Sequence, residues 1–224
     1  MKKGMNWWCD RAWIKFGCAI TAGVTAAILW NWTVWSAELK IVAAVAALIP
    51  MHVVEEWVFP GGFHYQYNSL FHSKRPDRYP MCRLSDMITN LGTTILFLVL
   101  ALICDRQGYV SPGLLLGIMI FSALEVVFHT AIGVSMYLTF RKNGKSTIYG
   151  PGSITAYLGF GVLGVLSWHS IRGGILTGAD WGIAIALLAV IAVGFILIPE
   201  NVIKRTKCDR YYFRNAGYFQ QFLR

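Results

Sequence analysis

Six long apolar stretches constrain the fold of this chain more than any other feature of its sequence. A helix that crosses a lipid bilayer needs about 20 mainly apolar residues. The stretches are Phe16–Val34, Ile41–Phe59, Ser85–Ile103, Pro112–Phe140, Ser153–Ser170 and Trp181–Ile198. Only 14% of the 224 residues are charged and the mean hydropathy is +0.52, whereas about a quarter of the residues in soluble domains are charged. The sequence therefore predicts an all-α membrane bundle of about six transmembrane helices, with residues 1–224 forming one integral-membrane domain.

The basic residues indicate how this bundle is oriented. Of the 20 lysines and arginines, only Lys40, Arg106 and Arg172 lie in the connections after the first, third and fifth stretches. Cytoplasmic segments concentrate lysine and arginine, so both termini are predicted to be cytoplasmic in a multi-pass protein of the cell membrane. The net charge of +9 then reflects topology, with membrane lipids rather than nucleic acid as the expected partner. The sequence does not identify a protein partner.

Ionisable residues within the apolar stretches are few, and they form a pattern. The second stretch contains His52, Glu55 and Glu56, and the fourth contains Glu125 and His129. A charged group inside a membrane costs at least ~2.5–3.5 kcal/mol, so such residues are candidates for function. Within each stretch a histidine and a glutamate are four residues apart, which places them on one face of a helix. The sequence therefore predicts a site where the second and fourth helices meet.

Two histidines and carboxylates on neighbouring helices favour a divalent metal. The predicted ligands are His52, Glu56, Glu125 and His129, with zinc favoured and iron second. Zinc accepts histidine and carboxylate ligands, leaves a position for water, and lowers the pKa of that water to about 7. Glu55 or Glu56 would then act as the general base. Iron fits the same ligands and would support oxidation instead of hydrolysis.

The predicted topology places further polar residues near this site. Asp86 and Asn90 begin the third stretch at the cytoplasmic side, where Asp86 is expected to be an N-cap after Ser85 and Asn90 a helix-packing residue. Ser153 is the expected N-cap of the fifth helix. The basic, aromatic C-terminal segment is expected to lie along the headgroup surface.

Three histidines are expected to lie outside the site. His64 and His72 fall in the long connection Pro60–Leu84 and are predicted to be solvated, while His169 lies toward the opposite side of the bundle.

Three short motifs carry a resemblance to a known family. They are "HVVEE", with His52, Glu55 and Glu56; the later His129; and "YGPG", with Tyr149, Pro151 and Gly152. In this order and spacing, over roughly residues 40–155, the chain resembles the HXXEE-motif membrane proteins, with His64 or His72 as alternatives for the further histidine. The family has no assigned function, so the resemblance implies no particular reaction. Glu55, Glu56 and Tyr149 are the candidate catalytic residues.

Three classes of function remain open from the sequence. A metal-dependent membrane enzyme acting on an apolar or amphipathic substrate is favoured, with hydrolysis ahead of oxidation by non-haem iron. A proton- or cation-coupled transporter would use the same buried histidines and glutamates. The third class, a structural membrane subunit, gives no reason to place several ionisable residues inside the membrane. Bound metal is the observation that separates the first class from the other two.

Overall fold

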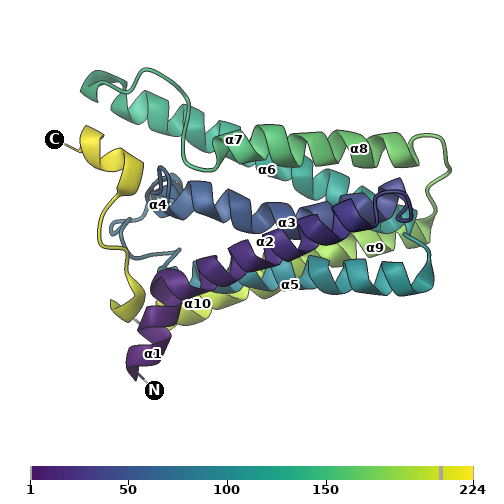
Figure 1. Cartoon of the computed structure of the whole chain (residues 1–224). Helices are drawn as coiled ribbons and strands as arrows, with labels where there is room; N and C mark the ends of the chain where they lie inside the picture. Colours follow the sequence, from purple (N-terminus) through teal and green to yellow (C-terminus); the bar gives the residue numbers. More distant parts are fainter. Residues whose placement is uncertain (1, 207–208, 224) are drawn as a thin grey trace.

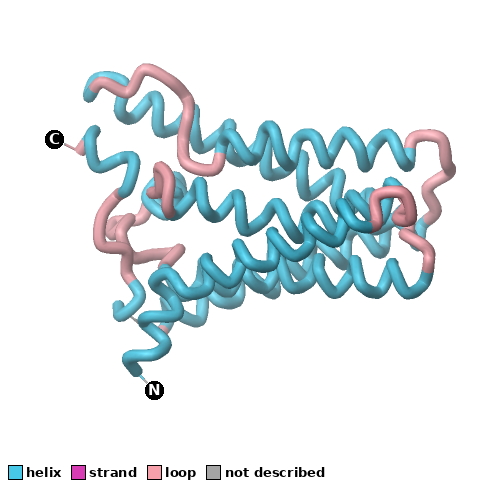
Figure 2. The backbone as a smooth tube through the Cα atoms, in the orientation of Figure 1, coloured by secondary structure: helices cyan, strands magenta, loops and turns pink. Residues whose placement is uncertain are grey.

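The chain folds into a bundle of long helices. A computed structural model describes residues 2–206 and 209–223, so Met1, Lys207, Cys208 and Arg224 lie outside the described residues. Every regular element of the described part is helical (Figure 2), which confirms the all-α prediction. Both ends of the described chain lie at the same end of the bundle (Figure 1).

Six helical stretches in the described part of the chain are long and apolar enough to cross a membrane, which confirms the predicted number. They are α2 (Trp13–Trp30), α3 (Ala37–Trp57), α5 (Arg83–Gln107), α6 (Pro112–Phe140), the run α7 (Ser153–Thr155), η3 (Ala156–Phe160) and α8 (Gly161–Ile171), and the run α9 (Gly178–Ala189), η4 (Val190–Leu197) and α10 (Ile198–Arg205). Preceding α2 are α1 (Lys2–Trp7) and η1 (Trp8–Ala12). The sixth stretch extends beyond its predicted apolar core because the Thr177 and Asp180 side chains form a capping box at its start.

Helix α3 lies at the centre of the bundle. It packs against α2 on one side and α5 on the other, and 61% of its apolar window is buried, the largest share among the six spans. Pro50 interrupts the hydrogen-bond ladder of α3, and Gly17 of α2 provides room for its ring. One turn from the break, the Thr21 hydroxyl donates to the Ala47 carbonyl at 2.8 Å. Neighbouring hydroxyls of this kind make a proline tolerable in a membrane helix.

Helix α6 organises the second half of the bundle by packing against α8 and α9. Gly113 and Gly117 face α9, where a side chain at either position would meet the Asp180 backbone or Ala184 and Leu187. Close approach of the two helices therefore depends on these glycines. The fifth and sixth spans consequently lie beside the helix that carries Glu125 and His129.

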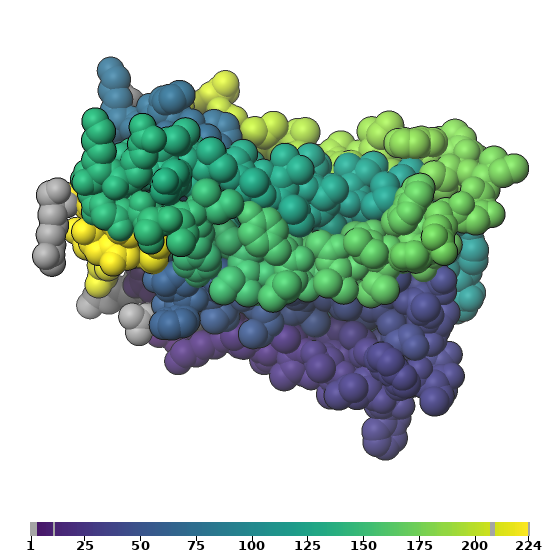
Figure 3. Space-filling view, turned by 90° about the horizontal axis from the view of Figure 1, so that it is seen from above, coloured from purple at the N-terminus to yellow at the C-terminus, as the bar shows by residue number. Residues whose placement is uncertain are grey.

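A short helix and the C-terminal segment close one end of the bundle. The helix α4 (Phe63–Leu70) lies in the long connection, and η2 (Arg141–Asn143), η5 (Asp209–Tyr211) and η6 (Gly217–Phe222) lie at the same end. Phe213, Phe219 and Phe222 are buried in one cluster with residues of α4 and α6. The segment therefore packs its apolar side chains on protein, and its position along the headgroup surface stays a prediction. Figure 3 shows the yellow segment against this end of the molecule.

Specific hydrogen bonds hold the C-terminal segment in place. Backbone amides of Phe213 and Tyr218 donate to the carbonyls of Asp77 and Gly61, each at 2.9 Å. The His64 ring stacks on Phe213 with 3.7 Å between ring centroids, and its Nε2 lies 2.9 Å from the Asn215 carbonyl oxygen. The prediction that His64 is solvated is wrong, since it is buried under this segment.

Acidification is expected to loosen the C-terminal segment. Burial lowers the pKa of His64 from 6.5 to about 3, so the folded state holds this ring neutral. Below pH 6.5 the histidine of the unfolded chain binds a proton that the folded state excludes, so the free energy of unfolding declines as the pH falls toward 3. At pH 5 the loss is on the order of 2 kcal/mol. Unfolding free energies in detergent at pH 7 and pH 5 measure this difference. The H64Q variant should lose most of the pH dependence, while H169Q, at an exposed position, should retain it; an unchanged slope in H64Q would contradict the assignment.

Candidate metal centre

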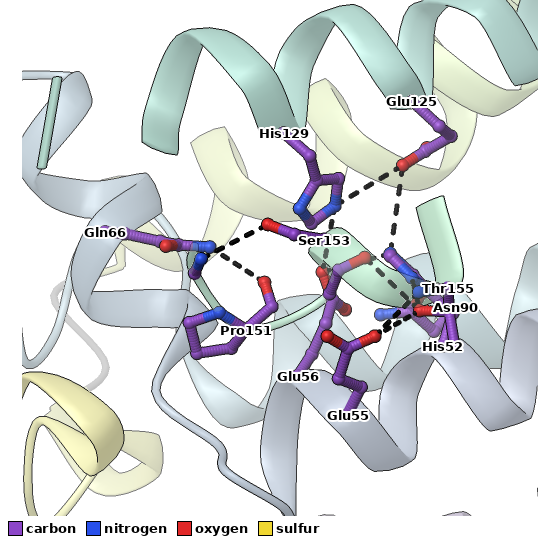
Figure 4. A network of polar contacts seen from close by, with 12 residues as sticks. His52, Glu55, Glu56, Gln66, Asn90, Glu125, His129, Pro151, Ser153 and Thr155 are labelled. Carbon is purple, nitrogen blue, oxygen red and sulfur yellow. Dashed lines mark hydrogen bonds and ion pairs between the residues drawn. The ribbon is translucent and has the colours of Figure 1, made fainter. Parts of the chain in front are cut away.

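Two helices bring four ionisable side chains together near the closed end of the bundle. His52 and Glu56 come from α3, and Glu125 and His129 from α6 (Figure 4). His52 Nε2 lies 3.2 Å from Glu56 Oε1 and 3.8 Å from Glu125 Oε2. His129 Nε2 lies 3.7 Å from each of the same two oxygens. Each imidazole thus faces one carboxylate of its own helix and one of the other.

The spacing of these atoms suits a single small cation. Ligand atoms of His52, Glu125 and His129 all lie within 4.8 Å of one another. Ligands about 2.0–2.1 Å from a tetrahedral zinc ion are about 3.3 Å apart, close to the separations of 3.2–3.8 Å observed here. The two histidines are at most 5% exposed, whereas the Glu125 side chain is 25% exposed. The group is therefore enclosed on the histidine side and open beside Glu125.

A hydrogen-bonded chain fixes the orientation of His52. Its Nδ1 lies 2.7 Å from Thr155 Oγ1, and that oxygen lies 2.6 Å from Glu55 Oε2. Glu55 accepts the hydroxyl proton, so Thr155 accepts the proton of Nδ1. This tautomer leaves the lone pair of His52 on Nε2, the atom that faces Glu56 and Glu125. Partners that hold a histidine in this way are typical of metal-ligating histidines.

Glu55 points away from the other carboxylates because the start of the fifth span supplies its hydrogen bonds. Its Oε1 accepts from the backbone amide of Ile154 at 3.1 Å, and its Oε2 from that of Thr155 at 2.9 Å. The first amides of a helix have no partner within the helix, and a carboxylate is favoured at that end by the helix dipole. Glu55 therefore caps the fifth span from a different helix.

Tyr149 completes the surroundings of Glu55. Its hydroxyl donates to Glu55 Oε1 at 3.3 Å. Burial and the adjacent carboxylate raise the pKa of Tyr149, so the phenol keeps the proton that it donates. Lys145 Nζ in turn donates to the Tyr149 carbonyl at 2.5 Å and lies over the Tyr218 ring at 4.8 Å. The loop that carries Tyr149 is thereby joined to the C-terminal segment.

The turn at Gly150–Gly152 brings backbone against the two imidazoles. Gly152 has a φ of +91°, and a Cβ at this position would collide with His129 Cε1 and lie 3.0 Å from His52 Cε1. Both nitrogens of the buried His129 lack a hydrogen-bond partner in the described part of the chain. Buried polar atoms without a partner are uncommon and often mark the place of an ion or water. His129 is therefore the residue whose surroundings most require a ligand.

A π-helical turn follows directly after Thr155. The segment η3 runs from Ala156 to Phe160, and the Phe160 ring packs edge-on against His52 with 5.3 Å between centroids. Such single turns of wider helix recur at functional sites. Here the turn lets the chain continue as α8 while both Thr155 and Phe160 contact the histidine.

Several expectations about neighbouring residues are corrected. Asp86 is not an N-cap, because Cys82 occupies the N-cap position of α5. Asp86 is buried and accepts hydrogen bonds from Trp57 Nε1 and from Asn90 Nδ2, the latter at 2.7 Å. Asn90 therefore hydrogen-bonds within its own helix. Ser153 is not the N-cap of the fifth span: Gly152 occupies that position, and the Ser153 hydroxyl oxygen accepts from the Gly150 amide.

The remaining histidines lie apart, as the sequence indicated. His72 and His169 are exposed and belong to none of these contacts. Thr155 and Gln66, which donates to the Pro151 carbonyl at 2.9 Å, were not identified from the sequence. Neither residue is ionisable, so only their placement by the fold distinguishes them from other polar residues.

A methyl group at Gly152 should disrupt the site more than the backbone conformation alone would. Gly144 has a similar φ of +95° but open space around it, so Gly144→Ala reports the backbone cost, about 1 kcal/mol. Gly152→Ala is expected to lose a further ~1–3 kcal/mol because the imidazoles must move. Unfolding free energies of the two variants in detergent measure the difference. Equal losses would show that the imidazoles do not pack against this turn.

Comparison with known proteins agrees with the motifs. A family model described as "Protein of unknown function with HXXEE motif" matches residues 43–169. No curated protein and no solved structure matches the chain. The matched region contains all four side chains of the cluster, the Tyr149–Gly152 turn and Thr155. The chain is a member of the HXXEE family.

Proposed function

We propose that this protein is a metal-dependent membrane enzyme whose ion is held by His52, Glu125 and His129, with Glu56 beside them. The observation that carries the proposal is the buried His129, which has no hydrogen-bond partner among the described residues and lies 3.7 Å from two carboxylate oxygens. A divalent ion would pair with both carboxylates and accept the nitrogen lone pairs. Two histidines and one carboxylate form the ligand set of several catalytic zinc sites, and they also suit non-haem iron. We favour zinc over iron.

A zinc ion in this site would supply a bound water with a pKa of about 7, a nucleophile at neutral pH. The remaining roles, proton transfer and positioning, are assigned to residues of the chain. Glu56 Oε1 lies 3.2 and 3.7 Å from the two imidazoles and accepts no hydrogen bond from a backbone amide of the described residues, so it is the proposed general base or fourth ligand. Glu55 and Tyr149 are positioning residues, because the oxygens of Glu55 are taken by the start of the fifth span and by Tyr149 itself.

The surroundings of Glu125 favour an apolar or amphipathic substrate. Glu125 is the partly exposed member of the cluster, and the neighbouring Leu124 and Val127 are 54% and 63% exposed. In a membrane these side chains face lipid. A substrate that reaches Glu125 past these side chains therefore comes from the bilayer. Since most basic residues lie toward this end of the bundle, we propose that the site belongs to the cytoplasmic half of a cell-membrane protein.

Stoichiometric metal in the purified protein is the expected result. Inductively coupled plasma mass spectrometry of protein purified in detergent should find about one zinc or iron per chain. The H129A and E125A variants should lose it because each removes a ligand, while H169A, an exposed histidine, should retain it. A folded wild-type protein without metal would contradict the proposal and favour a proton relay through the same residues. Iron in place of zinc would change the proposed chemistry from hydrolysis to oxidation.

The hydroxyl of Thr155 is expected to tune metal affinity without touching the ion. Thr155→Val keeps the shape of the side chain but removes the link between Glu55 and His52 Nδ1. Loss of such an outer partner typically weakens metal binding by about 10–100-fold. Thr155→Ser retains the hydroxyl and should bind metal nearly as the wild type does. Competition with a zinc chelator measures both variants, and equal affinities would show that Thr155 does not orient His52.

A further inference from the structure

A second polar site lies in a separate pocket beside α10. The pocket has a volume of about 450 Å³ and lies between α4, the connection that follows it and the end of the sixth span. Its walls include Tyr67, Phe71, Lys74, Leu197, Glu200 and Lys204. We refer to it as the α4–α10 pocket. None of its residues belongs to the His/Glu cluster.

Glu200 places a buried carboxyl group in this pocket. The residue is 7% exposed, and its Oε2 accepts a hydrogen bond from the Tyr67 hydroxyl at 3.3 Å. Among the described residues Glu200 forms no ion pair within 4.0 Å, and the cation that acts on it electrostatically is Lys204, four residues further along α10. A buried carboxylate without a direct ion pair is unfavourable in its ionised form. A positively charged group of a ligand would supply the missing partner.

The remaining walls suit a ligand that also carries a negative charge. The Tyr67 and Phe71 rings pack together with 4.9 Å between centroids, and aromatic faces attract ammonium groups. Lys74 and Lys204 line the same pocket but are exposed. The pocket therefore offers a carboxylate and aromatic rings inside and two cations at its rim. A zwitterion with an inward ammonium and an outward phosphate is complementary to this arrangement.

The position of the pocket indicates that this zwitterion is a lipid headgroup. The sixth span ends at Lys204 and Arg205, as helices do at the level of lipid phosphates. Leu197 lines the pocket and is 50% exposed, and Val193, four residues before it in the π-helical segment η4, is 48% exposed. These two apolar side chains lie about one turn apart and lead from the pocket toward the membrane interior. Acyl chains attached to the headgroup can follow them.

We propose that the α4–α10 pocket binds phosphatidylethanolamine, with the ammonium on Glu200 and the phosphate on Lys74 and Lys204. A primary ammonium donates hydrogen bonds to a carboxylate, whereas the trimethylammonium of phosphatidylcholine has no N–H to donate. Phosphatidylglycerol has the phosphate but no cation for Glu200. Selectivity among these three headgroups therefore tests the role of the buried carboxylate.

Native mass spectrometry of the detergent-purified protein with the three lipids, matched in acyl chains, measures this selectivity. We expect one phosphatidylethanolamine per chain, bound at least about tenfold more tightly than phosphatidylcholine, as a charge-assisted hydrogen bond would give. Glu200→Gln retains an acceptor for Tyr67 but removes the charge, so it should bind both lipids alike. Asp105→Asn, at an exposed carboxylate near the end of α5, should keep the wild-type preference.

Three outcomes would overturn the proposal. They are equal retention of phosphatidylethanolamine and phosphatidylcholine by the wild type, tighter retention of phosphatidylglycerol, and binding of soluble phosphoethanolamine as tight as that of the lipid. The double variant K74A/K204A provides an independent test, because both lysines are exposed and their loss should leave the fold intact. It should bind phosphatidylethanolamine and phosphatidylglycerol more weakly than the wild type; unchanged binding would exclude the phosphate contact.

Discussion

The hydrogen bonds between Glu55 and the start of the fifth span join the fold of this protein to its candidate site. Amides at a helix start within a membrane need a partner, because lipid offers none. Glu55 of α3 supplies it for Ile154 and Thr155. The same carboxylate accepts the Thr155 hydroxyl proton and so fixes His52. The packing of the fifth span and the orientation of a proposed ligand therefore depend on one side chain.

The spacing of ionisable residues was the part of the site that the sequence could predict. In a membrane helix a histidine and a glutamate four residues apart are rare, and the pairs His52/Glu56 and Glu125/His129 meet in the structure. The partners that orient them depend on tertiary structure. Thr155 resembles any other threonine until the Gly152 turn brings it against α3. Asp86 followed a serine and so resembled a helix cap, but its partner Trp57 lies 29 residues away in the sequence.

The C-terminal segment shows a limit that applies to membrane proteins in particular. Its sequence is basic and aromatic, a composition that suits the headgroup surface. Apolar side chains gain as much by packing on protein as by entering lipid, so hydropathy does not distinguish the two. The packing of this segment on protein depends on backbone hydrogen bonds to Asp77 and Gly61 and on the close contact of Gly62 with Gly217. These are long-range contacts without a sequence pattern.

The position and the partners of each carboxylate determine which charges the cluster can hold. Glu55 and Glu56 lie in the last turn of α3, near the helix end, where a charge in a membrane costs least. Glu125 lies 15 residues before the end of α6, but its contact with His52 places it at nearly the same level of the bundle as the end of α3. It contacts two histidines and no arginine or lysine among the described residues. A neutral imidazole offers it no charge, so an ionised Glu125 needs either a protonated histidine or a bound cation beside it, and the ligand atoms of His52, Glu125 and His129 have the spacing to hold a metal ion.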